Sequence, residues 1–179
     1  MDYFESICKT LLEDEGYWVR QSYKVELSKE QKRKLGKPSL PRPEIDLLAF
    51  NHQKNELIIF EVKSFFDSSG VKLKDIQHTH KFPEGRYKLV TCENFRKIIE
   101  DNVIKELVTK GLVSNKIQPK LGLIFGKVRT SDGEKIKSFC EEKNWFYWSP
   151  DDVQHRVKNL ALKGYENEPS VITAKILLR

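Results

Sequence analysis

The sequence lacks several patterns that mark common protein classes. Its three cysteines, Cys8, Cys92 and Cys140, lie far apart and include no C-x-x-C pair, which argues against a zinc site or a disulfide framework. No apolar run approaches the roughly 20 residues needed to span a bilayer, and the N-terminus does not resemble a signal peptide. We therefore expect a protein of a reducing compartment, cytoplasmic or otherwise intracellular, with no membrane partner.

Signatures of nucleotide-dependent enzymes and serine hydrolases are also missing. The chain contains no Gly-rich phosphate loop, no dinucleotide-binding fingerprint and no G-x-S-x-G. These absences argue against kinases, ATPases, dehydrogenases and serine hydrolases. The chain does carry an excess of positive charge, with 32 Lys and Arg against 26 Asp and Glu and a net charge of +6. Such an excess favours a polyanionic partner without indicating a fold.

The pattern of apolar residues predicts one α/β domain. A chain of 179 residues is long enough for a single large core. We expect a core over about residues 1–130, followed by a helix-strand-helix extension over 131–179. The expected elements are a helix at 2–15, a strand at 17–27, an irregular segment at 28–43, a hairpin at 43–64, a short helix at 73–81, a short strand or extended entry at 87–91, a helix at 93–110, a strand at 121–128, a helix opened by a capping box of Ser131 and Glu134, a strand at 145–148, a helix at 150–162 and a final strand or partner contact at 171–178.

The most informative stretch runs from residue 43 to residue 64. Two apolar runs are separated by a polar turn at 52–55, which predicts a β-hairpin. Because side chains alternate between the faces of a strand, Glu61 and Lys63 should share one face, and so should Glu44 and Asp46. Charged groups beside strongly apolar runs need partners or a metal. The hairpin therefore predicts a polar site at one end of two buried strands.

Two carboxylates and a lysine indicate a particular chemistry. Asp46 and Glu61 suit a hard cation such as Mg²⁺, which prefers oxygen ligands and keeps several waters. A cation there can polarise a phosphodiester and activate water, while Lys63 can orient the nucleophile or offset charge in the transition state. The alternative is a solvent-facing hairpin with a surface ion pair between Lys63 and a carboxylate. That alternative explains poorly why Glu61 interrupts an apolar run of the buried-strand kind.

Asp46, followed on the next strand by Glu61-Val62-Lys63, resembles the motif of the PD-(D/E)xK nuclease superfamily, which is restriction-endonuclease-like. The resemblance implies an α-β-β-β-α-β core with a mixed central sheet flanked by helices, and cleavage of DNA that depends on Mg²⁺ (or Mn²⁺). It implies that Asp46, Glu61 and the Val62 carbonyl bind the metal and that Lys63 is the catalytic lysine. The family's Pro-Asp pair is stretched here, so Glu44 either adds to the site or only precedes it.

The same resemblance suggests further site residues. Some of these nucleases place a glutamate from the first helix at the metal, which would be Glu5; the alternative is a solvated helix charge. Some carry a Q-x-x-x-Y element after the lysine, which would begin at Gln77, but position 81 is Lys. Restriction enzymes of this type often work as dimers, so a homodimer is a further expectation. His78 and His80 lie two residues apart, which does not suit a shared helix face or a zinc pair.

A basic segment precedes the first strand of the hairpin. Residues 28–43 contain three prolines and a glycine, which predict an irregular loop. Its side chains could hold phosphates near the metal without reading sequence; the alternative is a mobile, solvated loop. Basic residues continue after the hairpin, from Lys72 to Lys88. The candidate nucleic-acid contacts are Lys32, Arg33, Lys34, Lys37 and Arg42.

Three functional hypotheses follow from these observations. The first is a Mg²⁺-dependent DNA endonuclease. The second is a nucleic-acid-binding module on the same fold that does not cleave. The third is an unrelated basic protein whose hairpin charges form surface pairs. Dependence on a metal separates the first hypothesis from the second.

Overall fold

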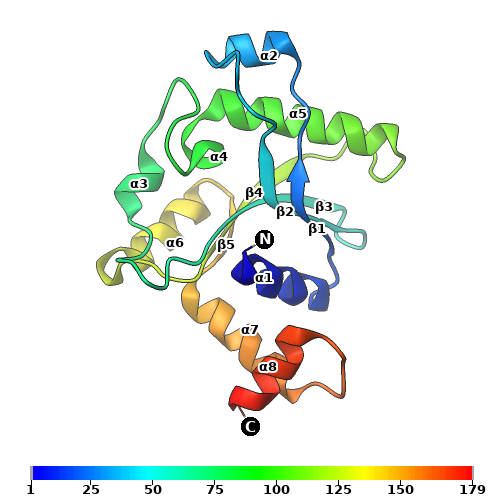
Figure 1. The fold of residues 1–179 in the computed structure, drawn as a ribbon, viewed down its shortest axis with the longest axis vertical. Helices are drawn as coiled ribbons and strands as arrows, with labels where there is room; N and C mark the ends of the chain where they lie inside the picture. Colours follow the sequence, from blue (N-terminus) through cyan, green and yellow to red (C-terminus); the bar gives the residue numbers. More distant parts are fainter. Residues whose placement is uncertain (1, 179) are drawn as a thin grey trace.

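A computed structural model describes residues 2–178, which form a mixed α/β fold around a five-stranded sheet (Figure 1). The strands stand in sequence order, with β1–β2 and β2–β3 antiparallel and β3–β4 and β4–β5 parallel. The mixed sheet predicted from the sequence is therefore confirmed. The strands are β1 (Trp18–Lys24), β2 (Glu44–Asn51), β3 (Glu56–Lys63), β4 (Pro119–Phe125) and β5 (Phe146–Trp148).

Helices cover both faces of this sheet. On one face, Ile59 and Leu121 pack with Ile99 and other apolar residues of α4, α5 and α6. On the other face, Phe60 packs with Leu12 and other residues of α1, α7 and α8. Figure 1 shows α5 and α1 on opposite sides of the strands. The helices are α1 (Tyr3–Asp14), α2 (Lys29–Lys34), α3 (Leu73–Gln77), α4 (Lys88–Thr91), α5 (Glu93–Thr109), α6 (Gly133–Glu142), α7 (Pro150–Leu162) and α8 (Pro169–Leu178), with a 3₁₀ turn η1 (Thr130–Asp132) before α6.

Close packing in the centre of the sheet requires a glycine. Phe60 of β3 lies beside Gly122 of β4 in the parallel register. A Cβ atom at position 122 would stand 2.4 Å from the Phe60 ring and 2.7 Å from Ile58. The aromatic ring therefore fills the space that a side chain on β4 would otherwise occupy.

The prediction of an irregular loop over 28–43 is wrong for residues 29–34, which form α2. The helix begins because Ser28 and Gln31 satisfy each other's backbone groups. The Gln31 N–H donates to the Ser28 hydroxyl oxygen (3.1 Å), and the Ser28 N–H donates to Gln31 Oε1 (2.9 Å). This reciprocal capping box stabilises a first turn whose N–H groups have no helical partner.

Two further segments are helical where the sequence indicated other structure: a short strand or extended entry at 87–91, and a final strand or partner contact at 171–178. Residues 88–91 form α4, where the Thr91 N–H donates to the Tyr87 carbonyl (2.8 Å) and the Cys92 N–H donates to the Lys88 carbonyl (3.1 Å). Residues 171–178 belong to α8, which starts where the Val171 N–H donates to Glu168 (3.0 Å). The helix α6 is present, but its predicted capping box is wrong, since the Ser131 hydroxyl donates to Asp132 instead (3.1 Å).

All three cysteines are buried as free thiols. Within residues 2–178, no helix is both long and apolar enough to cross a membrane.

Candidate active site

The predicted cluster forms where β2 and β3 separate. Their backbone pairing begins at Leu47–Phe60 and does not include Asp46. Beyond that pair the Val62 N–H donates to Asp46 Oδ2 (2.8 Å), so the carboxylate takes the place of a backbone acceptor. The separation of the strands therefore fixes Asp46 against the end of β3.

The backbone of β1 and β2 is irregular beside Asp46. The register passes from Gln21–Leu47 to Tyr23–Ile45, and Ser22 between them has a φ of +54°. Leu47 packs in the core beside α1, whereas Ile45, two residues away, packs in the core beside α5. Strict alternation of faces therefore fails at Asp46, although the register of β1 and β2 is the same on both sides of this irregularity.

Three oxygen atoms converge on the ammonium group of Lys63. Its Nζ lies 2.6 Å from Glu61 Oε1, 3.0 Å from the Val62 carbonyl oxygen and 3.1 Å from Asp46 Oδ2. The side chains of Glu61, Lys63 and Asp46 are only 10%, 20% and 21% exposed. The cluster is therefore a largely buried polar site and not an exposed ion pair.

Burial and charge act in opposite directions on these groups. Burial raises the pKa of Glu61, and the charge of Asp46 adds to this effect. Lys63 opposes both without cancelling them, so the pKa of Glu61 is about 7. Burial alone would lower the pKa of Lys63, but the two carboxylates outweigh it and hold that pKa above its usual value. Two carboxylates around one ammonium leave an excess of negative charge when all are ionised. The cluster can therefore accept a further cation.

Two of the three additional residues suggested by the sequence lie at or beside the cluster. Glu44 lines the same cavity as Asp46 and Glu61. Glu5, on α1, accepts from Gln21 Nε2 (3.3 Å). Burial raises the pKa of Glu5, and Asp46 raises it further, so the Glu5 carboxylate interacts with the cluster. Gln77 is exposed at the end of α3 and lines a different cavity, with Arg96 and Trp145.

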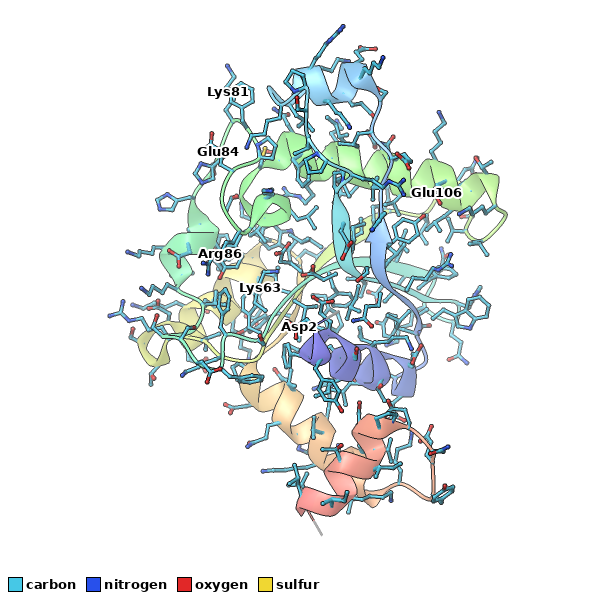
Figure 2. The ribbon with its side chains drawn as sticks, viewed as in Figure 1. Asp2, Lys63, Lys81, Glu84, Arg86 and Glu106 are labelled. Carbon is cyan, nitrogen blue, oxygen red and sulfur yellow. The ribbon has the colours of Figure 1, made fainter. Side chains whose placement is uncertain are left out.

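The cluster lies in a cavity of about 450 Å³ with a basic rim. Cations of Arg42, Arg86 and Lys88 line it together with the carboxylates. Figure 2 shows Arg86, from the segment before α4, on the same side of the molecule as Lys63. The sequence did not single out Arg86 and Lys88, because α3 and the following loop separate them from β3. The run of basic residues from Lys72 to Lys88 was the feature of the sequence that could have indicated them.

The basic segment before β2 divides into two parts. Arg42 lines the cavity, and its Nε also lies 2.9 Å from Glu26. Lys34 pairs with Glu30 within α2 (2.9 Å). Lys32, Arg33 and Lys37 also lie on α2 or just after it, and this helix stands beside α5, away from the sheet (Figure 1). Of the five predicted contacts, only Arg42 lines the cavity.

The oxygen atoms of the cluster fit a hard divalent cation. Within residues 2–178, no group of three or more His, Cys, Asp or Glu forms a metal cage. The donors are instead two carboxylates and the Val62 carbonyl, which already surround one positive charge. Mg²⁺ suits such a site because it keeps several waters and needs few protein ligands.

Comparison with known protein families, curated proteins and solved structures finds no match for this chain. The functional proposal below therefore depends on the residues and geometry of the site.

Proposed function

We propose that the protein is a Mg²⁺-dependent (or Mn²⁺-dependent) endonuclease that hydrolyses phosphodiester bonds in DNA. The observation that carries this proposal is the convergence of Asp46, Glu61 and the Val62 carbonyl around Lys63 Nζ. The basic rim of the same cavity supports it, because Arg42, Arg86 and Lys88 provide charge for a polyanionic substrate. Buried free thiols are in keeping with an intracellular setting.

Each residue has a defined role in this proposal. Asp46, Glu61 and the Val62 carbonyl would hold Mg²⁺, which when bound polarises the phosphodiester and acidifies water. Lys63 would orient the attacking water or offset the charge that develops on the phosphate. Arg42, Arg86 and Lys88 would bind the phosphates on either side and keep the backbone in place.

The order of the elements also supports the proposal. Helix α1, strands β1, β2 and β3, helix α5 and strand β4 follow one another as in the α-β-β-β-α-β core of the resembled superfamily. Asp46 lies on β2 and Glu61-Val62-Lys63 lies on β3, and the contacts of Lys63 bring these residues together. The short helices α2, α3 and α4 would then be insertions in that core, and α6, β5, α7 and α8 would be additions after it.

Cleavage of supercoiled plasmid and of branched DNA tests the proposal. We expect nicking with Mg²⁺, none with EDTA, and a loss of about 100-fold or more in Lys63→Ala. Lys9→Ala is the matched control, because it also removes a lysine that is paired with a carboxylate, here Glu13 on α1 (3.0 Å), but outside the site. This variant should cleave DNA at the wild-type rate. Nicking in EDTA, or wild-type activity in Lys63→Ala, would contradict the proposal.

The same assay, combined with a DNA-binding measurement, distinguishes the endonuclease from the alternative, a binding module that does not cleave. One observation favours that alternative, since Lys63 already neutralises part of the charge of the two carboxylates. Tight, salt-sensitive DNA binding without cutting in Mg²⁺ or Mn²⁺ would support it. Neither cutting nor binding would support an unrelated basic protein.

A further inference from the structure

A second cavity borders the one that holds the carboxylates. It measures about 430 Å³, and Gly85 and Arg86 line both cavities. This volume is within the range of small-molecule sites in proteins. The second cavity is lined by Phe65, Ser68, Ser69, Gly70, Lys72, Asp75, His78, Gly85, Arg86 and Tyr87.

Phe65 reaches this cavity through an unfavourable backbone conformation. It follows Lys63 by two residues and has a φ of +50°, in the left-handed region that bulky residues rarely adopt. Its ring is only half-buried; it packs edge-to-face with Tyr87 (centroids 6.5 Å apart), and the Arg86 guanidinium lies 5.8 Å from its centroid. Such strain persists where the surrounding structure holds it, often at binding sites.

The lining of the cavity combines the two kinds of group that bind a nucleotide. Arg86 and Lys72 offer positive charge for a phosphate. Among the residues that line this cavity, Asp75 carries the one carboxylate. The half-buried ring of Phe65 offers aromatic surface on which a base can stack, and the buried Tyr87 supports that ring from behind. Arg86 lines both cavities. It would therefore contact the sugar-phosphate backbone of a nucleic acid where that backbone passes from one cavity to the other.

We propose that this second cavity is a subsite for the unpaired nucleotide next to the scissile phosphodiester, so that the substrate is DNA that is single-stranded or locally opened. This inference rests on the proposed nuclease function for its position along the substrate. A base inside a duplex is stacked and paired, and it must leave the helix before it can enter a cavity. A single strand or an opened junction presents the base without that step.

Fluorescence anisotropy of labelled oligonucleotides at low salt, in EDTA, tests this subsite without cleavage. The probes are a short single strand and a duplex of the same length. Phe65→Gly removes the ring and relieves the backbone strain, whereas Phe65→Tyr keeps the ring. Phe66→Ala is the matched control, because Phe66 is the neighbouring aromatic residue but packs against Phe4 in a different cavity. Arg86→Gln, compared with the exposed Lys137→Gln on α6, tests the charge.

We expect the single strand to bind more tightly than the duplex. Phe65→Gly and Arg86→Gln should each weaken single-strand binding by about tenfold, whereas Phe65→Tyr, Phe66→Ala and Lys137→Gln should stay near wild type. Equal single-strand affinities of Phe65→Gly and Phe66→Ala, or a wild-type preference for duplex, would overturn the subsite. Circular dichroism confirms that each variant is folded.

The two proposals can fail separately. If plasmid is nicked in a Mg²⁺-dependent way but Phe65→Gly binds like wild type, the nuclease proposal stands and the subsite is wrong. If nothing is cleaved but single-strand binding needs Phe65 and Arg86, the cavity is a nucleic-acid site without the nuclease.

Discussion

At the scale of single residues, the ionisation of Glu61 depends strongly on its surroundings. Its carboxylate is buried beside another carboxylate, and Lys63 offsets only part of that effect. The pKa of Glu61 is therefore raised in the folded protein, and the unfolded chain releases this proton at lower pH. Burial and the charge of Asp46 disfavour the ionised form of Glu61, which is the form that would bind a metal, and a bound cation would favour it.

This raised pKa predicts how stability depends on pH in the absence of metal. Folded protein holds the Glu61 proton up to about pH 7, whereas the unfolded chain loses it near 4.5. The protonated Glu61 carboxyl therefore stabilises the folded state. This stabilisation is fully present below about pH 4.5 and is lost as pH rises through 7. We expect Glu61→Gln to become more stable relative to wild type over this window, by on the order of 1–3 kcal/mol.

Urea unfolding of wild type and Glu61→Gln between these pH values, in EDTA, measures the difference. Glu13→Gln, on the exposed part of α1, is the control for removing a carboxylate outside the site. A difference between Glu61→Gln and wild type that does not change with pH would contradict the electrostatic account.

At the scale of elements, the hairpin could be predicted because its own sequence determines it. Two apolar runs of suitable length and a polar turn specify β2 and β3, and each strand buries both faces. The segments 88–91 and 171–178 also contain strand-favouring residues, yet they are helical. Their conformation depends on the packing around them and on caps such as Glu168, which local composition does not report.

The packing of β3 on β4 predicts the effect of a single added methyl group. Gly122→Ala would place a Cβ atom against Phe60 and Ile58, both fully buried. We expect a loss of unfolding free energy of about 1–3 kcal/mol, because a tightly packed core has no room for the extra atom. Gly164→Ala is the control, since no heavy atom lies within 4 Å of its added Cβ. Equal urea midpoints for the two variants would show that the sheet tolerates the change.

At the scale of the whole molecule, the site depends on parts of the chain that lie far apart. Asp46, Glu61 and Lys63 come from one hairpin, so their spacing in the sequence revealed them. Arg86 and Phe65 meet only because the chain passes through α3 and returns before α4, which periodicity does not predict. Gln77 would begin a Q-x-x-x-Y element, but position 81 is Lys, and the fold places Gln77 in another cavity.

The distribution of positive charge predicts how DNA binding depends on salt. If Arg33 and Lys37 contact phosphates from α2 and the turn that follows it, the double variant Arg33→Gln/Lys37→Gln should lower the slope of log affinity against log salt by up to about 1.8. Titrations of duplex and single-stranded DNA at several salt concentrations, with Lys137→Gln as the control, measure this slope. An unchanged slope would remove α2 from the interface, and a flat salt response in wild type would remove phosphate contacts altogether.

The most direct test of the central claim is to measure cleavage and binding together in Asp46→Asn. The asparagine keeps an oxygen that can accept from the Val62 N–H but removes the charge that would hold a metal. We predict that Mg²⁺-dependent cleavage falls by about 100-fold or more, while DNA binding in EDTA stays within about twofold of wild type. Cleavage at the wild-type rate would show that the cluster of Asp46, Glu61 and Lys63 is not the catalytic site.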